Sequence, residues 1–175
     1  MFENKGRVYE INEESGVMDY GIARGSVHFD YDNDGDQDIF VVNQKPVNDV
    51  TYYGGVVGSK LYRNDSPNDN NWLKIKLKGN QSTTRGLGSR IRIVCEELNM
   101  IREVDGGSSH ASQNTSIIHF GLGDYKKIDS LFVTWPGGKD QYLTDIMSNQ
   151  LIEIEELFKE EPSFFDSIMK YFDWN

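Results

Sequence analysis

The residues with the clearest capacity for chemistry lie in one short stretch, FDYDNDGDQDIF, which spans residues 29–40. Aspartates occupy alternate positions of this stretch, at Asp30, Asp32, Asp34, Asp36 and Asp38. Like charges at such short spacing repel one another, so the cluster should destabilise a folded chain unless something compensates it. The pattern D-x-D-x-D-G-x-x-D therefore predicts a binding site for a cation.

Calcium is the cation that this pattern favours. It takes six to eight oxygen ligands, and carboxylates on alternate residues of a tight loop can converge on one ion. We expect Asp30, Asp32 and Asp34 to supply side-chain oxygens. Asp36 would supply its backbone carbonyl, and Asp38 would close the site with a bidentate carboxylate. Magnesium fits less well because it retains several waters, and a bound calcium ion would contribute to folding.

Other interpretations of the loop are weaker. An EF-hand loop needs a glutamate at its twelfth position and a helix on each side. Counted from Asp30, the twelfth residue is Val41, and the flanking sequences SVHF and IFVV have the character of strands. Gly35 would instead allow a sharp turn between two strands. A solvated acidic turn without an ion remains the alternative. A catalytic pair is disfavoured, because glycosidases place two carboxylates at a set separation in a cleft.

Composition limits the class of protein. The chain has 175 residues, of which 37% are hydrophobic and 12% aromatic, enough for a core in one ordinary domain or two small ones. The net charge of −10 disfavours nucleic acid and anionic membranes as partners. No apolar run is long enough to span a bilayer, and the first residues lack the apolar core of a signal peptide. We expect the chain as given to be soluble, without membrane insertion, and to be a candidate piece of a longer exported protein.

Alternating apolar and polar residues predict several half-buried strands. The clearest examples are WLKIKLK at 72–78, RIRIVC at 90–95, SLFVTW at 130–135 and QLIEIEE at 150–156. Short strands between glycine-rich turns are typical of sandwiches and barrels. The single cysteine, Cys95, lies in such a strand and is expected to be a buried, inert thiol.

Three segments follow from this pattern. Residues 1–66 hold the aspartate loop, residues 67–157 hold most of the alternating strands, and residues 158–175 change to a helical period. The expected fold is mainly β: a calcium-loop β-hairpin or propeller-blade unit, then an antiparallel β-sandwich or barrel, then a short amphipathic C-terminal helix. That helix would dock on its own domain or on a partner.

Two tryptophans are candidate ligand-binding residues. Trp72 and Trp135 lie in or beside predicted strands, and exposed aromatic rings can stack on sugar rings. The competing interpretation is that both residues fill a core or the seam between the two predicted segments.

Beyond these patterns, the sequence resembles two known families. Residues 21–44, GIARGSVHFDYDNDGDQDIFVVNQ, followed by KLYRND at 60–65, resemble one FG-GAP/VCBS-type repeat, the calcium-loop blade unit of integrin-like propellers. The second half resembles the ASPIC/UnbV domain of the cartilage acidic protein-like family. The resemblance is carried by residues 70–93, residues 106–139 and NQLIEIEE at 149–156.

This resemblance implies a calcium-binding, non-catalytic recognition or adhesion module that is extracellular or periplasmic. Its partner would be a protein or glycan surface, and Asp30, Asp32, Asp34, Asp36 and Asp38 match the calcium loop position by position. A carbohydrate-binding accessory domain of a secreted enzyme is the alternative. Catalysis by the chain itself is not expected, since no residue set nominates an active site. One departure is that propellers typically have four to eight blades, and the chain has sequence for about one.

Overall fold

The computed structural model describes residues 2–4, 8–10, 16–17, 19, 21–44, 58–65, 69–107, 110, 112–137 and 140–158. All regular secondary structure in these residues is β-strand, which confirms the mainly β fold class. The C-terminal helix expected over residues 158–175 lies outside the described residues, apart from Phe158. Nowhere in the described part of the chain is there a helix with the length and apolar character needed to cross a membrane.

The chain divides into two compact units, and each is described here by itself. The first unit comprises Met1–Asn68 together with Asp105–Thr115, and the second comprises Asp69–Val104 together with Ser116–Asn175. Asp105–Thr115 is therefore separated in sequence from the rest of the first unit. The sequence did not predict that Asp105–Thr115 would belong to the first unit. This polar segment lies between two strands of the second unit, and its residue types do not indicate what it packs against.

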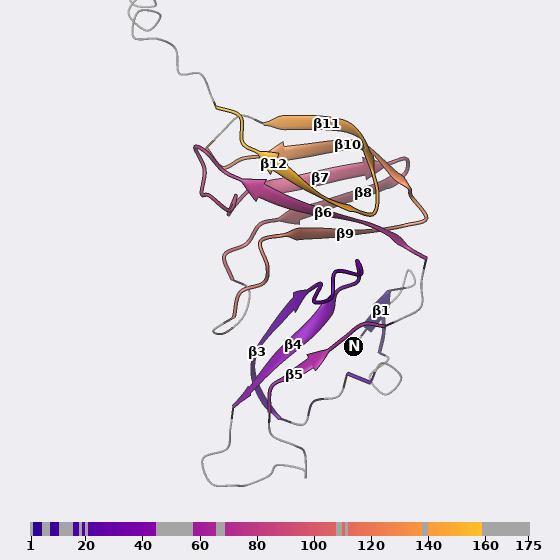
Figure 1. Ribbon diagram of the computed structural model, residues 1–175, viewed down its shortest axis with the longest axis vertical. Coiled ribbons are helices and arrows are strands. Elements are labelled where there is room, and N and C mark those ends of the chain that lie inside the picture. Colours follow the sequence, from indigo (N-terminus) through magenta and orange to yellow (C-terminus); the bar gives the residue numbers. More distant parts are fainter. Residues whose placement is uncertain are drawn as a thin grey trace, which may run out of the picture. The chain divides into compact units, whose positions relative to one another are not determined.

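The first unit is built around a three-stranded antiparallel sheet in the order β3-β4-β5 (Figure 1). Its strands are β3 (Ile22–Phe29), β4 (Asp38–Gln44) and β5 (Lys60–Tyr62). A separate antiparallel pair comprises β1 (Phe2–Asn4) and β2 (Val8–Glu10). The aspartate-rich residues 30–37 form the connection from β3 to β4, so the predicted hairpin is confirmed.

The segment Asp105–Thr115 packs on strand β3. The side-chain Oδ1 of Asn114 accepts a hydrogen bond from the backbone N–H of His28 at 3.1 Å. A Cβ atom added to Gly25 would lie 2.8 Å from the carbonyl oxygen of His110, closer than real Cβ contacts. Gly25 follows a register shift in the β3–β4 pairing. The absence of a side chain at Gly25 therefore allows this close approach.

The second unit is a β-sandwich of two sheets. One sheet has four antiparallel strands in the order β11-β10-β7-β8, and the other has three in the order β12-β6-β9 (Figure 1). The strand bounds are β6 (Asn71–Lys78), β7 (Arg90–Cys95), β8 (Leu98–Glu103), β9 (Ile118–Gly123), β10 (Lys127–Thr134), β11 (Gln141–Met147) and β12 (Gln150–Glu155).

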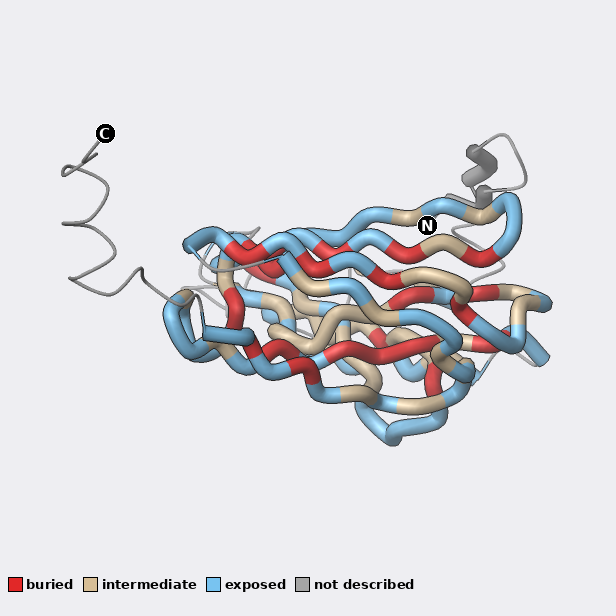
Figure 2. Tube along the Cα trace, turned by 90° about the horizontal axis from the view of Figure 1, so that it is seen from above, coloured by how far each residue is buried: buried red, intermediate tan, exposed pale blue. Residues whose placement is uncertain are grey.

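The core of the second unit lies between its two sheets. Along β7 and the second half of β10, from Leu131 to Thr134, buried and more exposed residues alternate as the sequence period predicts, and Figure 2 shows such alternation along the strands. Cys95 is fully buried, and burial raises the pKa of its thiol above the usual value, with a smaller contribution from the nearby carboxylates of Asp129 and Glu96. The fully buried apolar side chains include Leu73, Ile75, Ile91, Ile93, Phe120, Ile128, Leu131 and Val133.

The expectation of a purely antiparallel sandwich needs one correction. Strand β12 pairs in parallel with β6, so the three-stranded sheet is mixed. The two residues after β11, Ser148 and Asn149, carry the chain from one sheet to the other instead of closing a hairpin. Asn149 has a φ of 60° and exchanges hydrogen bonds with the backbone of Trp72: its N–H donates to the carbonyl at 2.6 Å, and its Oδ1 accepts at 3.0 Å. Asparagine tolerates this left-handed conformation better than most residues.

Candidate metal centre

The loop from β3 to β4 adopts a conformation that most sequences would resist. Gly35 has a φ of 103° and Asn33 a φ of 64°, both in the left-handed region. Glycine occupies this region without a steric penalty, and asparagine is enriched there. The backbone N–H of Gly35 donates to Oδ2 of Asp30 at 2.9 Å, which ties the turn to the start of the loop. The turn that was expected at Gly35 is therefore present.

Three of the five predicted carboxylates converge. Asp30, Asp32 and Asp38 each offer one oxygen, and these three oxygens all lie within 4.8 Å of one another. Calcium binds oxygens at about 2.4 Å, so ligands on opposite sides of one ion lie about 4.8 Å apart. Asp30 is half-buried, Asp32 is exposed and Asp38 is buried. The donor set therefore fits a hard divalent cation that enters from the exposed side.

Asp38 has a structural role that the sequence did not reveal. It is the first residue of β4 and is only 1% exposed. Its Oδ2 accepts a hydrogen bond from the backbone N–H of Tyr31 at 2.7 Å, and its Oδ1 accepts one from the backbone N–H of Asn64 at 2.8 Å. Asp38 thus joins the beginning of the loop to the end of β5. A carboxylate has about four lone-pair sites, so these bonds leave capacity for an ion.

The two remaining aspartates lie outside the converged group. Asp34 is exposed, and its Oδ1 accepts a hydrogen bond from the backbone N–H of Asp36 at 2.9 Å. This bond spans two residues and shapes the tip of the loop in the manner of an Asx turn. The structure thus brings Asp30, Asp32 and Asp38 together and places the carboxylates of Asp34 and Asp36 elsewhere on the loop.

A cationic side chain lies beside the loop. Nε of Arg63 is 3.9 Å from Oδ2 of Asp32 and 2.9 Å from Oδ1 of Asp65. The hydrogen bond to Asp65 raises the pKa of Arg63 above its ordinary value, and the negative charges of Asp65, Asp32 and Asp34 add to this effect. Sequence analysis missed Arg63, because only the pairing of β4 with β5 brings it next to the loop.

The two candidate ligand-binding tryptophans have different surroundings. Trp135 is 3% exposed and belongs to the core of the second unit, where its indole N–H donates to Oε1 of Gln141. This burial argues against Trp135 as a sugar-stacking residue, since 3% exposure leaves little of the ring for a sugar to cover. Trp72 is half-buried, with the His119 ring stacked at 6.5 Å and the Lys74 ammonium 4.7 Å from its centroid.

Comparison with known proteins finds a family match in the second half of the chain. Residues 79–161 match the family described as ASPIC and UnbV. The match begins just after β6 and includes the strands from β7 to β12. The ASPIC/UnbV part of the resemblance is therefore confirmed, and it belongs to a region that contains most of a β-sandwich.

Among individual proteins, the chain is similar to cartilage acidic protein 1. It is 26% identical to the Homo sapiens protein over 135 residues, which is 75% of this chain and 19% of that protein. The protein from Mus musculus gives the same identity and coverage, and the one from Xenopus tropicalis is 26% identical over 132 residues. The chain thus spans about a fifth of the length of these relatives.

Proposed function

We propose that the chain is a calcium-stabilised, non-catalytic recognition module, in which the ion fixes the loop between β3 and β4. The convergence of the Asp30, Asp32 and Asp38 oxygens supports this proposal most directly. Three carboxylates at this separation repel one another, and a divalent cation would reverse the sign of that electrostatic energy. The ion's contribution is structural, because binding energy gained only in the folded loop stabilises that loop.

The proposed role for each residue follows from its position. Asp32 is the exposed ligand, Asp30 links the ion to the turn at Gly35, and Asp38 links it to the sheet. Backbone carbonyls of the loop and waters would complete the six to eight oxygens that calcium takes. The first unit would then be an FG-GAP/VCBS-type repeat, as its sequence resemblance implies.

The recognition role rests on the second unit and on its relatives. A β-sandwich with an apolar core presents strand faces and loops to solvent, and such scaffolds serve many binding functions. The similarity to cartilage acidic protein 1 supports a location outside the cell or in the periplasm, where calcium is abundant enough for sites of modest affinity. The partner would be a protein or glycan surface.

Calcium binding is tested by isothermal calorimetry on chelator-stripped protein, paired with thermal melts. We expect one site and a rise in the melting temperature of about 10 °C when calcium exceeds its dissociation constant 100-fold, because such an excess adds about 2.7 kcal/mol. Asp32→Ala should abolish the rise, and magnesium should not reproduce it. Leu151→Thr, in the second unit, is the matched control. Absence of both heat and a melting shift would rule out the structural ion.

Neutralising Arg63 should strengthen calcium binding. The guanidinium lies beside Asp32 and opposes the charge of an incoming cation. At the surface this interaction is screened, so Arg63→Gln is expected to tighten calcium binding about two- to five-fold at low salt and less at high salt. Arg24→Gln provides the control, because Arg24 is an exposed arginine of the same unit that bonds to Gln44. An unchanged affinity at low salt would place the ion away from Asp32.

A further inference from the structure

One face of the second unit has a composition that its core packing does not require. In the four-stranded sheet, Tyr142 pairs with Phe132, Phe132 pairs with Arg92, and Arg92 pairs with Ile101. These four residues, here called the outer row, thus form a line across all four strands. All four are exposed, with Tyr142 at 59%, Ile101 at 52% and Phe132 at 38%. The row presents apolar and aromatic surface where the alternating pattern calls for polar side chains.

The aromatic members of the outer row form a pre-ordered surface. The Phe132 and Tyr142 rings are 4.8 Å apart between centroids and tilted by 40°. The Tyr142 hydroxyl is 3.1 Å from Oγ of Ser130, a hydrogen-bonding distance that restrains the ring. Aromatic side chains on a rigid sheet lose little conformational entropy when a ligand stacks on them.

The cation of the outer row is held in place by its neighbours. The Arg92 guanidinium lies over the Phe132 ring, 5.5 Å from its centroid, and its Nε donates to Oδ1 of Asn99 at 3.1 Å. Within the described residues, Arg92 forms no ion pair. A guanidinium oriented in this way retains N–H donors that match a carboxylate or sulfate in a two-pronged geometry.

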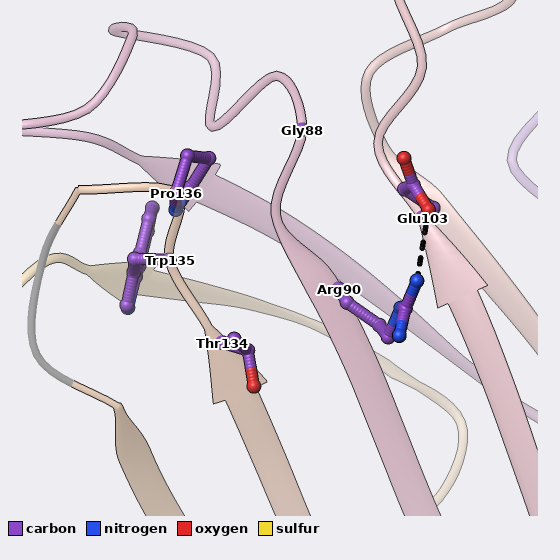
Figure 3. Close-up of a pocket in the computed structure, with 6 residues that line it drawn as sticks. All are labelled: Gly88, Arg90, Glu103, Thr134, Trp135 and Pro136. Carbon is purple, nitrogen blue, oxygen red and sulfur yellow. Dashed lines mark ion pairs between the residues drawn. The ribbon is translucent and has the colours of Figure 1, made fainter.

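A pocket adjoins the outer row on the same face. A second row of paired residues crosses three of these strands and consists of Thr134, Arg90 and Glu103. Each of its members lies two residues along its strand from a member of the outer row, so the two rows are about 7 Å apart. These residues line an open pocket of about 270 Å³ together with Gly88, Trp135 and Pro136 (Figure 3). Arg90 and Glu103 are 3.6 Å apart and both largely exposed, so their ion pair is weak and a ligand anion can displace it.

The distribution of charge opposes an anionic ligand less on this unit than on the first. The first unit contains 13 acidic and 6 basic side chains, whereas the second contains 15 acidic and 12 basic ones. The strong negative balance therefore lies mainly outside the sandwich. Two arginines, Arg90 and Arg92, stand in neighbouring rows of one face with the aromatic pair beside them.

We infer that this face binds an acidic saccharide chain, with a sugar ring stacked on Phe132 and Tyr142 and its anionic substituent paired with Arg92. The apolar faces of sugar rings stack on aromatic side chains, and Asn99, Ser130 and Thr134 offer polar partners for hydroxyl groups. A second ring would occupy the pocket beside Arg90. The surface is open and extends over both rows, which suits a chain better than a single small molecule. This inference deepens the proposed recognition role and rests on it.

The test compares two hexasaccharides with the same β-1,4-linked glucose backbone: the uronate form, in which carboxylates replace the hydroxymethyl groups, and neutral cellohexaose. Binding is measured by calorimetry on the full chain in chelator, because calcium also binds uronates. We expect sub-millimolar binding of the acidic hexamer and at least ten-fold weaker binding of the neutral one. Stacking contributes about 1–1.5 kcal/mol, so Phe132→Thr and Tyr142→Thr should each weaken binding about five- to ten-fold.

Arg92→Gln should reduce affinity for the acidic hexamer to that for cellohexaose, and Arg92→Lys should fall between, because lysine retains charge without the planar fork. Leu151→Thr, which removes an exposed side chain of the other sheet, should bind as the wild type does. Thermal melts confirm that each variant is folded. Equal binding of both hexamers, no binding at 1 mM, or unaltered binding by Phe132→Thr, Tyr142→Thr and Arg92→Gln would overturn the inference.

The same samples separate this inference from the calcium proposal. A calcium-dependent melting shift without saccharide binding would rule out the saccharide site and leave the calcium proposal standing. Saccharide binding in chelator, without any change of the melting temperature in calcium, would support the saccharide site and rule out the structural ion. The two units carry the two predictions independently, since the loop lies in the first and the outer row in the second.

Discussion

Asp38→Ala is expected to destabilise the first unit by about 2–5 kcal/mol, with or without calcium. The carboxylate is buried, and its two oxygens accept the backbone N–H groups of Tyr31 and Asn64. Removing an acceptor from a buried donor costs about 1–3 kcal/mol, and two donors lose theirs here. Asp38→Asn retains one acceptor oxygen and should lose roughly half as much stability.

Amide hydrogen exchange is the appropriate measurement, because it follows β3, β4 and β5 separately from the sandwich. Exchange of these strands should accelerate in Asp38→Ala in both chelator and calcium. Asp32→Ala supplies the contrast. Since Asp32 is exposed and close to two other carboxylates, its removal should be neutral or slightly stabilising in chelator and destabilising in calcium. If Asp38→Ala exchanged its amides in chelator at the same rates as the wild type, the Asp38 carboxylate would not stabilise the loop.

Glu156→Ala should destabilise the second unit by about 3–5 kcal/mol at neutral pH. Glu156 follows β12, is 1% exposed and accepts hydrogen bonds from the turn after β6. Its Oε2 accepts from the backbone N–H groups of Asn80, Gln81 and Ser82 at 2.7–2.9 Å, and its Oε1 accepts from the Ser82 hydroxyl at 2.8 Å. One buried carboxylate thus accepts hydrogen bonds from three successive backbone N–H groups and one hydroxyl of this turn.

The pH dependence of this contribution has a definite sign. Burial by itself would raise the pKa of Glu156, but the hydrogen bonds from Ser82, Asn80 and Gln81 outweigh it and hold the pKa below the ordinary value of 4.5. The stabilisation is therefore complete above pH 4.5 and is lost as the pH falls through the lower folded-state pKa. Glu156→Gln should remove this part of the acid sensitivity. The difference in unfolding free energy between the wild type and Glu156→Gln should therefore become smaller at low pH.

Chemical denaturation followed by tryptophan fluorescence measures the effect, because Trp72 and Trp135 both lie in the second unit. Glu155→Ala is a matched control one residue away. Its side chain is 55% exposed and pairs with Lys78, so its removal should cost far less stability than the removal of Glu156. Equal losses for the two variants would mean that burial of Glu156 does not decide its contribution.

Much of the fold was predictable from local sequence. The alternation in RIRIVC and SLFVTW assigned Ile91, Ile93, Leu131 and Val133 to the core, and all four are buried. Such patterns work because side chains of a strand alternate between its faces with a period of two. The hairpin around the aspartates was predictable for the same reason, since two apolar runs flank a turn with Gly35 at its tip.

Pairing between distant strands was not predictable in this way. The parallel alignment of β12 with β6 joins residues 77 positions apart, and nothing in either strand specifies the direction of its neighbour. The grouping of Asp105–Thr115 with the first unit depends likewise on contacts with β3. Periodicity identifies the buried face of a strand, whereas the partner and the register depend on the packing of the whole domain.

The candidate site shows the same division. The sequence by itself determined that a cluster of like charges sits in a turn between two strands, and it predicted a compensating cation there. Only the tertiary structure decided that Asp38 joins Asp30 and Asp32 while Asp34 bonds to the loop tip, and that Arg63 lies beside them. It likewise aligned Tyr142, Phe132 and Arg92 from three separate strands. The reason is physical: residue type and period fix what a side chain can do and which face it takes, but convergence at a few ångströms requires the long-range pairing of strands.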